Sequence, residues 1–143
     1  MPERRETERT TSQVVGRNVA RIRGGRAMTT RALAAALTEL GVPLTSSGIT
    51  DIEAGRRTVS VDQLTALATA LDVSPIALLM PESGPENDHR VKLTGTPTVL
   101  SLAMLPWLRG DVPIRAEEWD DAFEVEAFRR RSLPSWSWKR GAD

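Results

Sequence analysis

Residues 29–57 constrain the fold more than any other part of this chain, because they hold the start and stop signals of two short helices in succession. Thr29 is placed to cap the first helix, since its hydroxyl oxygen can accept a hydrogen bond from a free first-turn N–H. Met28 and Leu33 have the spacing of a hydrophobic staple around that cap. The apolar face of the helix then repeats at helical spacing through Leu33, Ala36, Leu37 and Leu40.

Gly41 ends this helix, and Pro43 prevents its continuation. A second, shorter helix is expected over residues 46–54, with Ile49 and Ile52 pointing inward. Three neighbouring hydroxyl residues all suit its N-cap, namely Thr45, Ser46 and Ser47.

Three further helices are expected on either side of this pair. The first covers residues 13–23 and ends at Gly24-Gly25. The next starts at Ser60, where Gln63 completes a capping box, and the last starts at Ser74 with Pro75 in its first turn. Because helices this short are not stable alone in water, the five must pack on one another. The sequence therefore predicts an all-α domain of five helices.

The composition divides the chain into parts. All four tryptophans lie beyond residue 100, and a run rich in Pro, Gly and acidic residues starts at Pro81. We expect a disordered tail at residues 1–12, the helical domain at 13–80, a linker at 81–90 and a small, mostly helical C-terminal extension at 91–143.

Within the extension, the pattern predicts an extended stretch at residues 91–93 and a helix at 97–109 that Gly110 stops. A second helix is expected at 116–131, followed by an irregular end from Leu133. One face of that second helix would hold Trp119, Ala122, Phe123 and Ala127. Clustered tryptophans favour packing or an interface, and Trp136 and Trp138 are candidate anchors for a partner.

Several function classes find no support in the residues. The chain has no cysteine, and its one histidine, His89, lies in the expected linker. No catalytic triad, metal cluster or phosphate-binding loop is recognisable, so we expect no enzyme activity, no metal and no cofactor. The N-terminus has no apolar leader, and no apolar run is long enough to span a bilayer. We expect a cytoplasmic protein.

The net charge of zero gives no evidence for nucleic-acid binding, but its distribution is uneven. Residues 13–60 carry seven arginines against three acidic residues. A basic face of this kind is compatible with DNA binding, and a solvated helical face gives the same count.

Four segments of the expected domain occur in a characteristic order, and they are Arg17-Asn18-Val19-Ala20-Arg21-Ile22-Arg23, Met28-Thr29-Thr30-Arg31-Ala32-Leu33-Ala34, Gly48-Ile49-Thr50-Asp51-Ile52-Glu53-Ala54-Gly55-Arg56-Arg57 and Leu64-Thr65-Ala66-Leu67-Ala68-Thr69-Ala70-Leu71-Asp72-Val73. Together they resemble the Cro/C1-type (XRE) helix-turn-helix regulators, and the chain looks like the actinobacterial version with a short C-terminal extension. The resemblance implies a lambda-repressor-like fold that binds double-stranded DNA in a sequence-specific way, as a repressor-like homodimer in the cytoplasm.

In such proteins the short second helix of the motif lies in the major groove, and its exposed N-terminal residues touch base edges. The resemblance assigns base contacts to Ser46, Ser47, Thr50 and Asp51. It assigns phosphate contacts to Thr30, Arg56 and Arg57.

Other roles fit the same residues. Ser46 and Ser47 also suit helix caps, and Asp51 would be repelled by DNA unless it accepts from a cytosine amino group. Arg56 and Arg57 also fit a solvated turn, and Gly48 fits either a close approach or a weak helix.

The resemblance further implies an ion pair between Arg23 and Glu53, with two unrelated surface charges as the alternative. One departure from the family pattern is visible. From Leu33 to Ile49 is 16 residues, which is longer than in a standard helix-turn-helix. Both the first helix of the motif and its turn are extended, so the angle of the second helix is less constrained by the resemblance than the fold is.

Two other functions use the same fold. Antitoxins and adaptors use it as a protein-interaction module, and effector-sensing regulators add a ligand pocket. In this chain, residues 91–143 would supply dimerisation, packing, or a site for a small molecule or protein partner.

Overall fold

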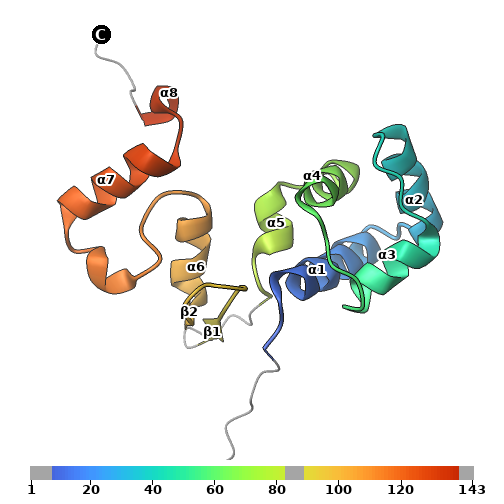
Figure 1. Ribbon diagram of the computed structural model, residues 1–143, viewed down its shortest axis with the longest axis horizontal. Helices are drawn as coiled ribbons and strands as arrows, with labels where there is room; N and C mark the ends of the chain where they lie inside the picture. The colour runs from blue at the N-terminus through green and yellow to red at the C-terminus, as the bar shows by residue number, and fades with distance from the viewer. Residues whose placement is uncertain (1–7, 83–88, 139–143) are drawn as a thin grey trace, which may run out of the picture. The chain divides into compact units, whose positions relative to one another are not determined.

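The computed structural model describes residues 8–82 and 89–138 and is mostly helical (Figure 1). It forms two compact units. The first contains the described residues up to Glu82 together with Lys92–Thr96, and the second contains the remainder. None of the helices in the described ranges has the length and apolar character needed to cross a membrane.

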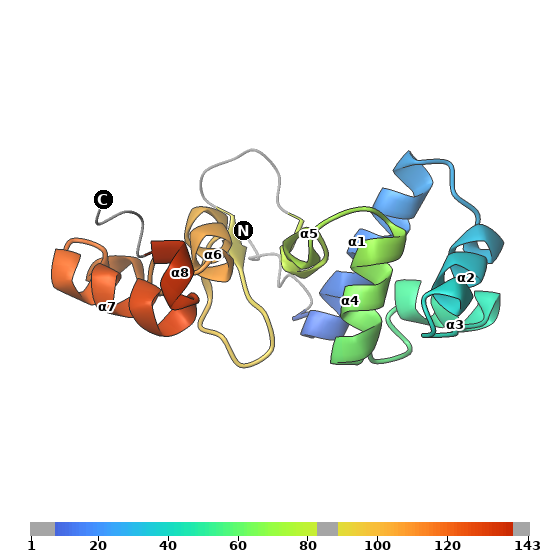
Figure 2. The same cartoon turned by 90° about the horizontal axis from the view of Figure 1, so that it is seen from above.

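The first unit is the expected all-α domain. Its five helices are α1 (Thr11–Gly25), α2 (Thr30–Glu39), α3 (Ser46–Glu53), α4 (Val61–Ala70) and α5 (Pro75–Leu79). Helix α1 packs against α3 and α5, α2 packs against α3 and α4, and α4 packs against α5 (Figures 1 and 2). The fully buried apolar side chains at the centre are Val19, Leu33, Leu37, Ile49, Ile52, Leu67, Leu71 and Leu78.

One polar side chain, Asn18, is buried in this core at 1% exposure. Its amide donates to the carbonyl oxygens of Leu78 and Met80, both at 2.8 Å. These two bonds satisfy backbone acceptors at the end of α5, so Asn18 fixes the last helix of the domain to α1.

The cap residues confirm most of the helix starts. Thr29 accepts from the N–H of Ala32, and Ser60 and Gln63 form the capping box of α4. Thr45 accepts from the N–H of Gly48 and is therefore the N-cap of α3. This leaves Ser46 and Ser47 within the helix, with hydroxyl groups that do not cap it.

The predicted bounds of the first helix are wrong at both ends. Thr10 forms a capping box with Gln13, so α1 begins at Thr11, inside the segment expected to be a disordered tail. Residues 1–7 of that tail lie outside the described residues. The helix also continues through Gly25, because the turn to a positive φ is made at Ala27, with φ of 53°.

The second unit begins with a small hairpin. Strands β1 (Arg90–Val91) and β2 (Val99–Leu100) pair antiparallel, with Val91 opposite Val99. Arg90 therefore belongs to a strand and not to the linker, whose residues 83–88 lie outside the described residues. The tip of the hairpin groups with the first unit, where Thr94 and Thr11 exchange hydrogen bonds between backbone N–H and side-chain oxygen at 3.0 and 2.9 Å.

The remaining elements of the second unit are α6 (Ser101–Leu108), the 3-10 turn η1 (Ala116–Glu118), α7 (Ala122–Ser132) and α8 (Ser135–Trp138). The helix expected at 97–109 starts later, because Val99 and Leu100 pair in the sheet. Both the backbone N–H and the hydroxyl of Ser101 donate to the carbonyl of His89, which fixes the start of α6. Gly110, with φ of 77°, ends that helix as expected.

The prediction of one helix at 116–131 is wrong. The chain leaves η1 at Trp119, whose ring N–H donates to the carbonyl of Pro113 at 2.8 Å, and Asp121 caps a new helix, α7. This interruption separates Trp119 from the rest of its predicted face, and Phe123 is 78% exposed. The end expected to be irregular contains the single-turn helix α8.

Candidate nucleic-acid interface

Helices α2 and α3 form a helix-turn-helix with a connection of six residues, from Leu40 to Thr45. Gly41 turns the chain with φ of 79°, and Leu44 returns it to the core at 6% exposure. Ile49 and Ile52 of α3 are fully buried. Because these two residues lie on one face of α3, the opposite face points out of the domain.

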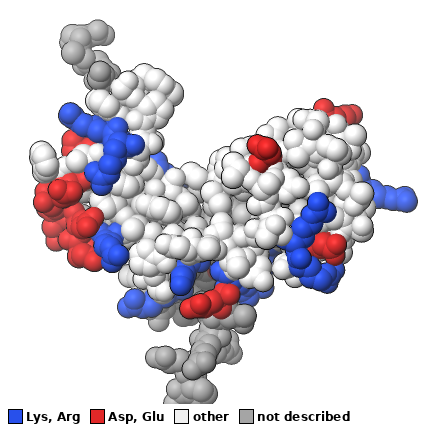
Figure 3. Space-filling model, in the orientation of Figure 1, with Lys and Arg blue, Asp and Glu red and all other residues white. Residues whose placement is uncertain are grey.

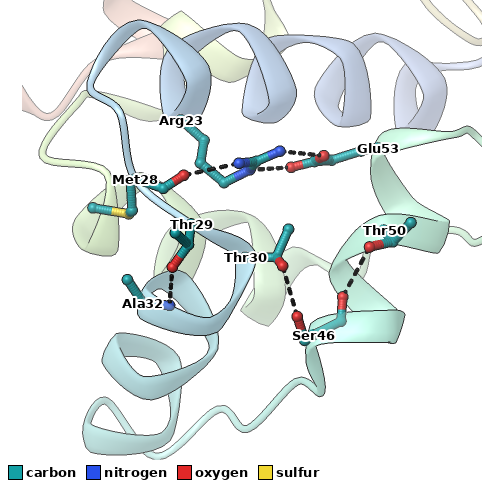
Figure 4. A network of polar contacts seen from close by, with 8 residues as sticks. All are labelled: Arg23, Met28, Thr29, Thr30, Ala32, Ser46, Thr50 and Glu53. Carbon is teal, nitrogen blue, oxygen red and sulfur yellow. Dashed lines mark hydrogen bonds and ion pairs between the residues drawn. The ribbon is translucent and has the colours of Figure 1, made fainter.

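An ion pair attaches the end of α3 to α1 (Figure 4). The Nε of Arg23 donates to Glu53 Oε1 at 2.6 Å, and Nη2 donates to Oε2 at 3.0 Å. Nη1 of the same guanidinium donates to the carbonyl of Met28 at 2.8 Å, just before the cap of α2. The hydrogen bond to Glu53 raises the pKa of Arg23, so the guanidinium stays charged. One residue therefore connects α1, the start of α2 and the end of α3.

A close approach between the backbones of α1 and α3 is a second contact that fixes α3. Gly16 of α1 lies so near α3 that a Cβ atom at this position would be 2.0 Å from the carbonyl oxygen of Ile52. That distance is far inside van der Waals contact, so only glycine fits here. Two independent contacts, Gly16 on Ile52 and Arg23 on Glu53, thus set how α3 lies on α1.

The outward face of α3 carries hydroxyl groups that are already hydrogen bonded (Figure 4). The hydroxyls of Thr30 and Ser46 are 2.6 Å apart, which joins the first turn of α2 to the first turn of α3. Thr50 donates to the carbonyl of Ser46 at 3.1 Å. Ser47 is exposed and lies 3.4 Å from the hydroxyl of Thr45.

The charged residues of the same face are also organised. Asp51 Oδ1 accepts from Nε and Nη2 of Arg56 at 3.2 and 3.0 Å, and both side chains are about half exposed. Arg57 lies on the first turn of α3, where a Cβ atom added to Gly48 would be 2.9 Å from its Nη1. The missing side chain at Gly48 therefore makes room for Arg57.

Of the seven candidate DNA-binding residues, the structure places four on α3, Arg56 and Arg57 just after it, and Thr30 at the start of α2 with its hydroxyl 2.6 Å from that of Ser46. It also shows two features that the sequence patterns did not indicate. Asp51 is paired with Arg56, so its carboxylate does not face solvent as an isolated negative charge. Gly16 has no local sequence signal, because its role depends on a contact with a helix 36 residues further along the chain.

Among the described residues, no group of three or more His, Cys, Asp or Glu side chains could hold a metal ion. A shallow groove between α2 and α4 is open to solvent and is lined by Leu40, Val42, Asp62, Thr65, Ala66 and Thr69. The groove also accounts for the one departure from the predicted face of α2, since Leu40 is 44% exposed.

No protein-family model matches the chain, and no curated protein matches it. Among solved structures, the chain is similar to the restriction-modification controller protein C.AhdI from Aeromonas hydrophila, known from a high-resolution crystal structure. The sequence identity is 28% and the TM-score is 0.41. The match covers 47% of this chain and 94% of that chain.

Proposed function

We propose that this protein is a sequence-specific regulator that binds double-stranded DNA as a repressor-like homodimer in the cytoplasm. The observation that carries the proposal is the outward face of α3. Its inward face is fixed by Ile49, Ile52 and the Arg23–Glu53 pair, while the other face presents hydroxyl and charged groups to solvent. A short helix held in this way is the element that helix-turn-helix proteins insert into the major groove.

The roles of the residues follow from their chemistry and positions. Ser47 is exposed in the first turn of α3, and its hydroxyl, which lies 3.4 Å from that of Thr45, can also donate to or accept from a base edge. Asp51 would accept from a cytosine amino group once Arg56 turns to a phosphate. Thr30 and Ser46, linked by their hydroxyls, would bind a phosphate and a base edge at the junction of α2 and α3.

Arg57 would contact the backbone beside the first turn of α3. Arg57 is exposed and its guanidinium lies close to Gly48, in the first turn of α3, where the helix dipole also favours an anion. Arg57→Ala should weaken binding to all duplexes alike. It should also reduce the slope of the logarithm of affinity against the logarithm of salt concentration by about one, because one fewer counterion is released. Arg115→Ala, an exposed arginine of the second unit, is the control and should leave binding unchanged.

Selection of bound fragments from a random duplex pool, followed by sequencing, tests the proposal. We expect one short motif to be enriched in two symmetric copies about 34 Å apart, one helical turn of DNA. Ser47→Ala should change the preferred base at one position of each copy. A pool that shows no enrichment, together with stoichiometric capture of a protein by the same face, would replace this proposal with the protein-interaction module.

A further inference from the structure

The second unit has a very small core for its size. Among its described residues, the buried apolar side chains are Val91, Ala103, Met104 and Pro113. No residue of α7 or α8 is buried. Units of about 60 residues are only marginally stable, and smaller ones usually need a further source of burial such as oligomerisation.

The two large aromatic side chains that this unit exposes most lie at opposite ends of α7. Phe123 is in the first turn of α7, and Trp136 is in α8, which begins after Leu133 and Pro134 at the end of α7. Each is 78% exposed. In Figure 1, η1 lies at the start of α7 and α8 lies beyond its end. Exposed aromatics of this size mark a surface that a partner covers.

The charges on α7 have opposite signs at its two ends. The residues around its start are acidic, and they are Glu117, Glu118, Asp120, Asp121 and Glu124. The last turn is basic, with Arg129, Arg130 and Arg131. Figure 3 shows the acidic side chains gathered over η1 and the beginning of α7, with basic side chains further along the helix.

The basic end is held in place by aromatic rings. The guanidinium of Arg130 lies 5.2 Å from the centre of the Trp138 ring, and that of Arg131 lies 5.4 Å from the Phe128 ring. The first contact places the charge of Arg130 beside α8, which also carries the exposed Trp136, and the second holds the charge of Arg131 against α7 itself.

From these observations we infer that α7 is a self-association surface, on which the α7 helices of two copies of this chain pack antiparallel. In that arrangement the acidic start of one helix lies beside the basic end of the other, and the helix dipoles are opposed as well. Phe123 of one copy then meets Trp136 of the other. Because a two-fold axis repeats every contact, both aromatic residues of both copies are covered at once.

A parallel arrangement fails on the same charges, since it would place acid beside acid and base beside base. This surface would form the homodimer of the proposed function, and to that extent the inference rests on the proposed function. Its test needs no DNA, however, so a failure here removes this dimer surface and leaves the assignment of α3 as a DNA-binding helix standing.

Sedimentation of the full chain over a range of concentrations, without DNA, measures the association. We expect a dimer, and we expect Phe123→Ala and Trp136→Ala each to raise the dissociation constant about tenfold or more. Val61→Ala is the matched control, because Val61 is also 78% exposed but lies on α4 of the first unit. Its dissociation constant should equal that of the unchanged chain.

Reversing the charges at one end of α7 tests whether the two α7 helices pack antiparallel. One variant carries Glu117→Lys, Glu118→Lys and Asp120→Lys, which makes the start of α7 net positive and keeps its N-cap Asp121. The other carries Arg130→Glu and Arg131→Glu, which makes the end of α7 net negative. Each alone should be monomeric where the unchanged chain is a dimer, because both ends of its α7 then have the same sign. An equal mixture of the two should form a mixed dimer, which also shows that each variant is folded.

Three results would overturn the inference. The first is an unchanged chain that stays monomeric at all concentrations, since α7 would then be covered within one copy or not at all. The second is a dimer that both aromatic substitutions leave unaffected, which would place the interface elsewhere. The third is a mixture of the charge variants that does not associate.

Discussion

At the scale of single residues, polar side chains join elements of the first unit that are distant in sequence. Arg23 is the clearest case, because one guanidinium bonds both Glu53 and the carbonyl before α2. Its pKa is raised in the folded protein, so its contribution to stability is complete at neutral pH and is lost only as the pH rises into the strongly alkaline range. The Arg23 guanidinium therefore stays charged, and available to Glu53, at neutral and moderately alkaline pH.

Glu53→Ala should lower the free energy of unfolding by about 3 kcal/mol, because it leaves a largely buried arginine without its partner. Glu126→Ala removes the partner of an exposed arginine within α7 and should cost about 0.5 kcal/mol or less. Thermal or urea unfolding of the two variants measures the difference. Equal stability of the two would mean that the Arg23–Glu53 pair does not hold the domain together.

Substitution of Asp51 should affect DNA recognition and not stability, in contrast to substitution of Glu53. Its pair with Arg56 is half exposed, so Asp51→Ala should change the free energy of unfolding by about 0.5 kcal/mol or less. If Asp51 reads a cytosine, the same variant should lose about 1 to 3 kcal/mol of discrimination at one base position. Binding titrations with the selected duplex and its single-base variants measure this. Unchanged discrimination at every position would assign Asp51 only to the orientation of Arg56.

At the scale of elements, the helices whose signals are local could be predicted, and those that depend on distant contacts could not. The starts of α2 and α4 follow from Thr29 and from the Ser60–Gln63 box, which act within one turn. The start of α6 depends on the carbonyl of His89, twelve residues earlier, so apolar content alone placed it too early.

The same distinction applies to the candidate site. The family resemblance located α3 and its polar residues, but it did not indicate that Asp51 would be paired or that α1 would need a glycine against α3. The Asp51–Arg56 pair depends on how the chain turns after α3, and the Gly16 contact depends on how two helices pack. Neither is a property of a local pattern.

Two glycines of α1 test this packing directly. Gly16→Ala should destabilise the first unit by about 3 kcal/mol, because the added methyl group meets the backbone carbonyl of Ile52, which cannot move aside alone. Gly24→Ala, in the same helix, meets nothing within 4 Å and should stabilise the protein by about 0.5 to 1 kcal/mol. Denaturant unfolding compares them. A Gly16→Ala variant as stable as Gly24→Ala would contradict the close packing of α1 on α3.

At the scale of the whole molecule, the two compact units have separate roles in this account. The first presents α3 for the proposed DNA binding, and the second carries the surface on which we infer that two copies associate. A net charge of zero makes the chain as a whole a weak attractor of DNA, so the proposed DNA binding would have to come from local contacts of Thr30, Arg56 and Arg57 with phosphates. Such contacts release counterions, and the affinity should therefore depend on salt.

The most direct measurement of the central claim is the affinity of the full chain for the selected duplex as a function of salt concentration, beside a duplex of the same composition in scrambled order. We predict that the logarithm of the association constant falls linearly and steeply with the logarithm of the salt concentration, and that the selected duplex stays at least about 1000-fold tighter than the scrambled one. An affinity that is flat between low and high salt, or equal for the two duplexes, would contradict the assignment of α3 as a DNA-reading helix.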